Sequence, residues 1–209
     1  MRFVALGDSY TIGTSVRAEE RWPNQLVAML AAEARAAGRE PPLELVGNPA
    51  VNGFTTRDVI AVELPQLEAF GPELASLLIG TNDVIQGLGE DRYRGNLEVI
   101  LDAVTALTGP GRLFGVTSPD YTVTPAGRDY GDPAVRSAGL RRHNAIFAAV
   151  LSARGIPVVD IHDLSLGAAA DRSLVAGDGL HPSGRQYGLW VERIVPVVRR
   201  LLDAAGGGG

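Results

Sequence analysis

The sequence contains no cysteine and no lysine. The absence of cysteine excludes disulfides, zinc sites built on thiolates and a cysteine nucleophile. No apolar run approaches the roughly 20 residues that a membrane-spanning helix requires. The basic residues are arginines scattered along the chain, and the net charge is -5. Because the chain is acidic and has no basic cluster, we expect no nucleic-acid partner.

The N-terminal sequence lacks the charged region, apolar core and cleavage site of a secretory signal peptide, since the apolar run after Arg2 is too short. We therefore expect a cytoplasmic protein, although a secreted protein without its signal peptide would have the same sequence. There is no internal repeat and no linker rich in proline and serine. We expect a single domain over residues 1–204 and a disordered glycine tail over 205–209. Nothing in the sequence indicates an oligomeric state.

Short apolar runs alternate with longer segments of helical periodicity. The runs predict strands that are covered on both faces, at residues 2–6, 43–47, 74–80, 112–116 and 156–161. The periodic segments predict helices at residues 22–37, 91–107, 134–153 and 183–203. Leu107 is expected to face inward, and Pro196 to kink the last helix. The alternation predicts the α/β class, with a central five-stranded parallel sheet in a three-layer α/β/α sandwich.

Polar motifs follow the first three predicted strands. They read "GDSYT", "NPAVNG" and "GTND". Ligands of parallel α/β sheets bind beyond the carboxyl ends of the strands, so we expect these motifs to converge at one edge. Two long loops, 117–132 and 162–180, are expected to rise over the same edge.

Ser9, in the first motif, has three interpretations. In the first interpretation, Asp8 or Ser9 only caps a helix or shapes a turn. Alternatively, the stretch is a phosphate-binding loop of the flavodoxin type, although it has neither GxGxxG nor GK[ST], and Asp8 would repel a phosphate. In the third interpretation, Ser9 is a nucleophile. This role requires a base and a group that orients the base.

The chain has only three histidines, so the search for a base is short. His143 falls inside a predicted helix, and His162 follows the fifth strand without a distinct motif; we expect a structural or surface role for both. His181 stands in "GDGLHPSG", three residues after Asp178. A turn can place Asp178 against one ring nitrogen of His181 while the other faces Ser9, as in a catalytic triad.

Acyl transfer also needs hydrogen-bond donors for the developing oxyanion. Three candidates follow adjacent strands: the Ser9 N–H, the Gly53 N–H and the side-chain amide of Asn82. Gly53 as a turn glycine and Asn82 as a cap residue remain alternatives. Their common edge favours the oxyanion hole.

Together these motifs resemble the SGNH/GDSL hydrolases, the GDSL-type esterases and lipases. The resemblance rests on four blocks that span nearly the whole chain in the family's order: "GDSYT", "NPAVNG", "GTND" and "DGLHP". Pro49 departs from the pattern, because many members have glycine or another small residue there. The resemblance implies an SGNH-type, flavodoxin-like α/β/α fold. It also implies a carboxylic ester hydrolase with a Ser9–His181–Asp178 triad and no metal or organic cofactor.

The substrate is less determined than the triad, because members of this family act on carbohydrate acetyl esters, lysophospholipids, thioesters and simple aryl esters. We expect a carboxylesterase for short to medium acyl chains, with a carbohydrate acetylesterase and then a lysophospholipase or thioesterase as alternatives. The expected substrate is a small-molecule, lipid or carbohydrate ester. Residues expected to shape the pocket, with core or loop packing as the alternative, are Tyr10, Phe54, Val84, Ile85, Tyr121, Tyr130 and Leu180.

Two interpretations without ester hydrolysis remain open. The scaffold would be a catalytically silent module that binds glycans or anions, or a flavodoxin-like protein that binds FMN. The joint presence of Ser9, Asn82, Asp178 and His181 argues against both, because binding alone needs no activated serine.

Overall fold

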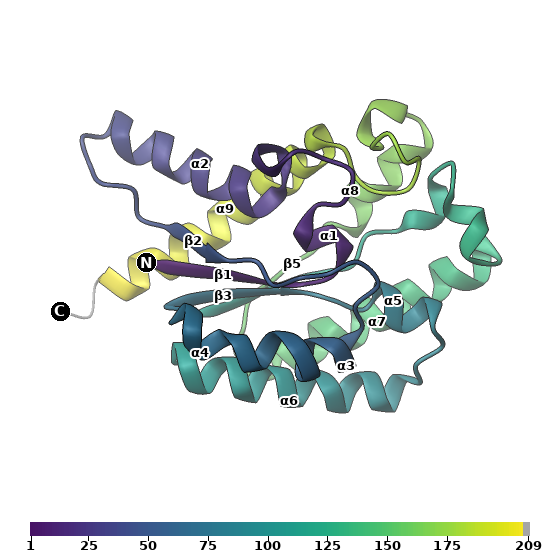
Figure 1. Cartoon of the computed structure of the whole chain (residues 1–209), viewed down its shortest axis with the longest axis horizontal. Helices are drawn as coiled ribbons and strands as arrows, with labels where there is room; N and C mark the ends of the chain where they lie inside the picture. Colours follow the sequence, from purple (N-terminus) through teal and green to yellow (C-terminus); the bar gives the residue numbers. More distant parts are fainter. Residues whose placement is uncertain (207–209) are drawn as a thin grey trace.

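The computed structural model describes residues 1–206 and is a three-layer α/β/α sandwich (Figure 1). Its sheet has five strands in the spatial order β2-β1-β3-β4-β5, and every neighbouring pair is parallel. The predicted fold class is therefore confirmed. The strands are β1 (Arg2–Gly7), β2 (Glu44–Gly47), β3 (Leu74–Leu78), β4 (Leu113–Val116) and β5 (Val158–Val159).

The strand order changes direction at β1, which lies between β2 and β3. Gly7 at the end of β1 is in register with Leu78 at the end of β3. The segments that carry Ser9 and Asn82 therefore leave neighbouring strands at the same level of the sheet. In sheets of this kind, ligands bind at this point of topological reversal.

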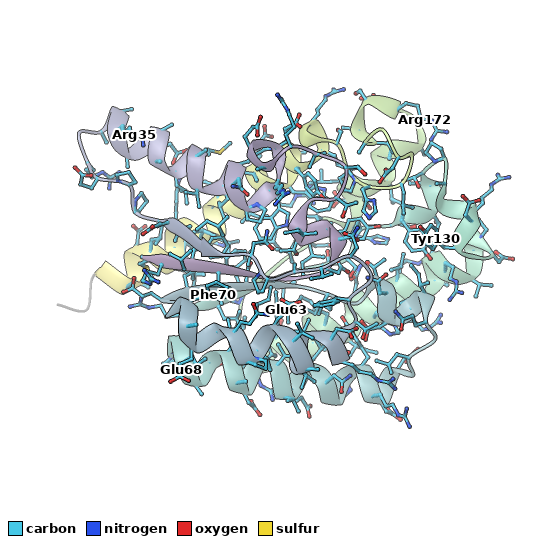
Figure 2. The ribbon with its side chains drawn as sticks, viewed as in Figure 1. Arg35, Glu63, Glu68, Phe70, Tyr130 and Arg172 are labelled. Carbon is cyan, nitrogen blue, oxygen red and sulfur yellow. The ribbon has the colours of Figure 1, made fainter. Side chains whose placement is uncertain are left out.

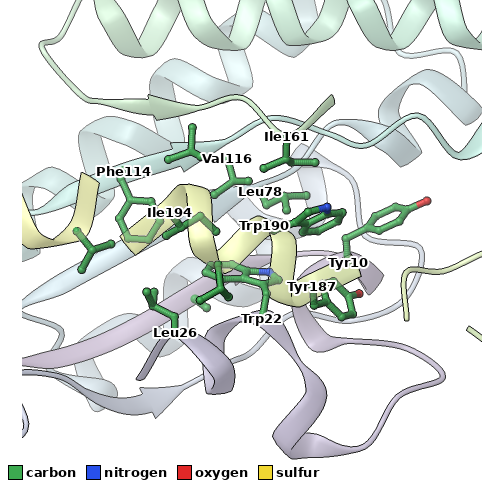
Figure 3. Packing of buried hydrophobic residues seen from close by; sticks show 14 of the residues in the cluster. Tyr10, Trp22, Leu26, Leu78, Phe114, Val116, Ile161, Tyr187, Trp190 and Ile194 are labelled. Carbon is green, nitrogen blue, oxygen red and sulfur yellow. The ribbon is translucent and has the colours of Figure 1, made fainter. Parts of the chain in front are cut away.

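One face of the sheet is covered by α2 (Trp22–Ala36) and α9 (Gly184–Gly206) (Figures 1 and 3). The rings of Trp22 and Phe114 meet edge to face with centroids 6.5 Å apart. Burying one large apolar side chain contributes about 2–3 kcal/mol. The predicted inward stripe of α9 is buried at Tyr187, Trp190, Val191, Ile194 and Val198 and half-buried at Leu201.

The other face is covered by α6 (Glu90–Thr108), α7 (Pro133–Ser152) and a segment that the sequence did not predict. That segment begins with α3 (Thr56–Asp58), continues as a π-helical turn over Val59–Glu63, and ends with a 3₁₀ turn and α4 (Leu67–Phe70). Figure 2 places Glu63 and Phe70 in this layer, below the sheet. Phe70 packs on Gly47, where an added Cβ would lie 2.8 Å from the phenyl ring.

Several predicted boundaries differ from the structure. β3 ends at Leu78 rather than 80, since the backbone turns sharply at Gly80, where φ is 137°. Helix α9 continues past Pro196 through Gly206, so the predicted tail does not begin at 205; residues 207–209 lie outside the described residues. Leu107 is 48% exposed because it lies in the last turn of α6, close to the exposed turn at 110–111.

The two long loops fold into short helical turns and meet each other. The Ala126 N–H donates to the Gly179 carbonyl at 3.0 Å, which joins the loop after β4 to the segment before α9. Within residues 1–206, no helix is both long enough and apolar enough to span a bilayer.

Candidate active site

Ser9 is the first residue of α1 (Ser9–Ile12), directly after β1. Asp8 caps this helix, with its carboxyl accepting from the Tyr10 N–H at 3.0 Å. Gly7 makes the turn possible because an added Cβ would lie 2.3 Å from the Leu78 carbonyl oxygen. The capping role therefore belongs to Asp8. The Ser9 side chain is left at the end of the strand, where the residue is 5% exposed.

A cavity of about 190 Å³ brings together the candidate residues from four separate segments. Ser9, Gly53, Asn82 and His181 all line it. Of the residues predicted to shape the pocket, those that also line this cavity are Tyr10, Ile85, Tyr121, Tyr130 and Leu180.

Phe54 and Val84, also predicted to shape the pocket, do not line this cavity. Val84 lies on α5 (Thr81–Ile85), one residue before Ile85, and successive helical residues point about 100° apart. Its side chain packs against α7, where an added Cβ on Gly139 would lie 2.8 Å from it. Phe54 takes part through its backbone carbonyl, which accepts a hydrogen bond from Asn82.

The ring of His181 is held by Asp178. His181 Nδ1 lies 2.6 Å from Asp178 Oδ2, and Asp178 Oδ1 accepts from the N–H groups of Leu180 and His181 at 2.9 and 3.0 Å. Burial opposes ionisation of Asp178, but hydrogen bonds from Ser15 and His181 outweigh it and bring the pKa well below its usual range. A carboxylate at this place favours the Nδ1–H tautomer, which leaves Nε2 of His181 as the basic nitrogen.

Ser15 is a member of this arrangement that the sequence analysis did not identify. Its hydroxyl donates to Asp178 Oδ2 at 2.6 Å, the same oxygen that meets the His181 ring. Ser15 is also the one non-glycine residue of the described chain with positive φ, at 65°. No local pattern marks Ser15, because the contact joins residues 163 positions apart.

The His181 ring also packs against Tyr10, with centroids 5.4 Å apart. Within residues 1–206, the Ser9 hydroxyl forms no hydrogen bond with this ring, although both residues line the cavity. Hydrogen bonds between a nucleophile and its base frequently tighten only when substrate is in place.

Two residues that line the cavity, Ser9 and Gly53, have backbone N–H groups without a partner in the described chain. Gly53 has φ of 82°, a conformation that glycine adopts without strain, and an added Cβ there would meet nothing within 4 Å. These two donors are therefore available to a bound oxyanion.

The Asn82 amide is partly engaged within the protein. Its Nδ2 donates to the Phe54 carbonyl at 2.9 Å and to Asp8 Oδ2 at 3.4 Å, and the second distance is longer than an ordinary hydrogen bond. Burial raises the pKa of Asp8 to about 8. Because the contact with Asp8 is long, one N–H of Asn82 is only loosely held.

Asp8 is one of three fully buried carboxyl groups behind the site, together with Glu63 and Asp83. Glu63 Oε2 accepts from the Gly7 N–H at 3.0 Å, and Asp83 accepts from the hydroxyl of Thr56 at 2.6 Å. Burial raises the pKa of Glu63 to about 8 and raises that of Asp83 as well. Within residues 1–206, none of the three forms an ion pair with an arginine or histidine.

The other two histidines lie elsewhere, as the sequence indicated. The His143 ring is buried beside Tyr93, with centroids 4.4 Å apart, and burial lowers its pKa. His162 Nδ1 lies 3.3 Å from the amide of Asn144, next to the end of β5. Neither residue lines the Ser9 cavity.

Comparisons with known proteins identify the family and the fold. Residues 5–189 match the model of the GDSL-like lipase/acylhydrolase family. No curated protein matches the chain. Among solved structures, a member of the lipolytic protein G-D-S-L family from Veillonella parvula superposes with a TM-score of 0.73 at 18% identity, covering 96% of this chain and 99% of its own.

Two carbohydrate-active proteins also have a similar fold. A family 3 carbohydrate esterase from Clostridium thermocellum has a TM-score of 0.72 at 17% identity, with 99% of each chain covered. An acetyl xylan esterase from Geobacillus stearothermophilus has a TM-score of 0.68 at 18% identity, covering 96% of this chain and 94% of its own. At these identities the likeness concerns the fold.

Proposed function

Because the chain belongs to the GDSL-like lipase/acylhydrolase family and is thus a hydrolase, we propose that it cleaves carboxylic esters through an acyl-enzyme on Ser9. The observation that carries the proposal is the cavity where Ser9, Gly53, Asn82 and His181 converge. Asp178 also supports the proposal, because its Oδ2 lies 2.6 Å from Nδ1 of the His181 ring.

The chemistry follows from these positions. Ser9 Oγ attacks the ester carbonyl while Nε2 of His181 takes its proton, and Asp178 stabilises the imidazolium. The N–H groups of Ser9 and Gly53 and the Asn82 amide bind the tetrahedral oxyanion. His181 then protonates the leaving alcohol. Water, deprotonated by the same ring, releases the acid and restores Ser9.

The size of the cavity supports short acyl groups. Its volume of about 190 Å³ lies below the range of about 300–1,000 Å³ typical of sites for drug-sized ligands. The aromatic rings of Tyr121 and Tyr130, whose centroids are 5.7 Å apart, line it together with aliphatic side chains. A small cavity also suits an acetyl group, so a carbohydrate acetylesterase is the second candidate.

The direct test uses a fluorophosphonate probe followed by peptide mass spectrometry. We expect labelling at Ser9, and no labelling or turnover in Ser9→Ala. Ser152→Ala, which removes an exposed serine at the end of α7, is the matched control and should leave both unchanged. Labelling of another serine in active protein would contradict the assignment, as would turnover in Ser9→Ala.

A series of p-nitrophenyl esters of increasing chain length tests the acyl group. We expect kcat/KM to be highest for acetate to butyrate and to fall for longer chains, because the cavity is small. A maximum at eight carbons or more would contradict this and favour a lysophospholipase or thioesterase.

A further inference from the structure

A second, larger cavity lies on the other side of α5. Its volume is about 870 Å³, and four arginines line it, Arg57, Arg92, Arg136 and Arg142, against two acidic residues, Glu90 and Asp91. The chain as a whole has a net charge of -5, so this excess of positive charge is local.

The four arginines differ in how they are held. Arg142 pairs with Glu90 at 2.8 Å, and Arg136 is fixed by the carbonyls of Tyr130 and Val84 at 2.9 and 2.7 Å. Arg57 and Arg92 form no hydrogen bond or ion pair through their side chains with any of residues 1–206. The guanidinium groups of Arg57 and Arg92 are thus free to bind a ligand, beside that of Arg136, which is held in place.

His143 also lines this cavity and is only 5% exposed. Its Nδ1 lies 3.2 Å from the Gly139 carbonyl. Burial lowers its pKa, against the opposing effect of the Gly139 and Leu88 carbonyls, so burial favours the neutral form of this ring. The positive charge of the cavity therefore comes from its arginines.

The cavity also includes the beginning of α6. Gly89 is the N-cap and offers no side-chain hydrogen bond to the first turn, and residues 89–92 line the cavity. Free N–H groups at the start of a long helix favour an anion. Gly87 and Gly89 leave room beside it, since an added Cβ on either would meet nothing within 4 Å.

The two cavities are lined by neighbouring residues. Ile85 lines the Ser9 cavity, and its neighbour Gln86 lines the arginine cavity and donates to the Gly53 carbonyl at 3.3 Å. On the other side, Arg136 of the arginine cavity is bonded to Tyr130 of the Ser9 cavity. The two cavities are therefore neighbours, and a substrate that reaches from Ser9 to the arginines would pass these residues.

We propose that the arginine cavity binds the anionic end, a carboxylate or phosphate, of the ester whose carbonyl reacts at Ser9. The proposal rests on the esterase function proposed above and specifies the substrate as an ester with a negatively charged group. Arginine is suited to this role because its planar guanidinium binds both oxyanions with paired hydrogen bonds.

The test compares two acetate esters that differ only in charge, 4-acetoxybenzoate and its methyl ester. In the double variant Arg57→Gln/Arg92→Gln, we expect kcat/KM for the anionic ester to fall about tenfold, since two exposed charge pairs are removed. The value for the methyl ester should change less than twofold. Arg35→Gln/Arg200→Gln is the control: it removes the same charge from exposed positions of α2 and α9. Figure 2 shows Arg35 on α2.

Binding of inorganic phosphate, measured by calorimetry, provides a readout without turnover. We expect the wild type and the control to bind phosphate and the Arg57→Gln/Arg92→Gln variant to bind it at least tenfold more weakly. Equal loss of activity on both esters, or phosphate binding that survives in that variant, would overturn the anion site. Phosphate binding without turnover of either ester by the wild type would instead overturn the esterase proposal.

Discussion

Replacement of Glu63 by glutamine should change how the stability of this protein depends on pH. Glu63 is fully buried in the π-helical turn behind β1, and its only hydrogen bond is the one that it accepts from the Gly7 N–H, within the described chain. Burial is the main cause of its raised pKa, and the nearby carboxyl of Asp8 adds to it. A glutamine side chain at this position keeps the shape and the acceptor but cannot ionise.

The magnitude follows from the pKa. Burial raises the pKa of Glu63 from 4.5 to about 8. At 1.36 kcal/mol per pH unit, ionising this group in the folded state costs about 5 kcal/mol. An acid with a raised pKa holds its proton more tightly when folded, so its contribution is fully present below pH 4.5 and is lost as the pH rises to 8. The wild type should therefore lose about 1.4 kcal/mol per pH unit in this range through Glu63 alone.

Urea unfolding from pH 5 to pH 8 measures this effect. The free energy of unfolding of Glu63→Gln, relative to wild type, should rise by about 1.4 kcal/mol per pH unit. The buried amide of the introduced glutamine adds a cost that does not vary with pH, so the slope is the diagnostic quantity. Glu68→Gln, at an exposed position of the same layer (Figure 2), should run parallel to wild type. A parallel curve for Glu63→Gln would refute the reasoning.

Four further changes test the site and the fold around it. Asn82→Ala should raise the activation free energy for kcat on a short p-nitrophenyl ester by about 3 kcal/mol, with little change in KM, because the amide acts on the oxyanion. An intact kcat would exclude this role. Ser15→Ala removes a donor that helps to hold Asp178 behind the His181 ring, so kcat on a short p-nitrophenyl ester should fall several-fold with little change in KM; an unchanged kcat would mean that the hydroxyl is only structural. Gly80→Ala should destabilise by about 2–3 kcal/mol in urea unfolding, since φ is 137° and the Cβ would lie 2.6 Å from a buried tyrosine hydroxyl, whereas Gly95→Ala in α6 should stabilise by up to about 1 kcal/mol.

The elements that could be predicted from the sequence are those with one uniform period. Helix α9 has a single apolar stripe from Tyr187 to Val198, and its inward face was predicted correctly. The segment from α3 to α4 changes from α to π to 3₁₀ geometry within residues 56–70, so its apolar residues follow no single period. Glu63 in its middle is charged in the sequence but buried in the fold, a position that only tertiary packing determines.

In the candidate site, the sequence predicted which segments meet better than it predicted which way their side chains point. Ser9, Gly53 and Asn82 were expected together because the carboxyl ends of parallel strands share one edge, and the structure places them in one cavity. Side-chain direction was harder to predict. Val84 and Ile85 are adjacent, yet each lines a different cavity.

The order of the site residues along the chain has a consequence for how the cavity is assembled. Ser9 follows β1, whereas Asp178 and His181 directly precede α9. That helix rests on α2, through the Arg199–Glu33 ion pair and the hydrogen bond from Gln25 to the Gly184 carbonyl. The cavity that Ser9 and His181 line is therefore complete only when α9 has docked on α2. A substitution that loosens this contact would separate the two residues without changing either of them.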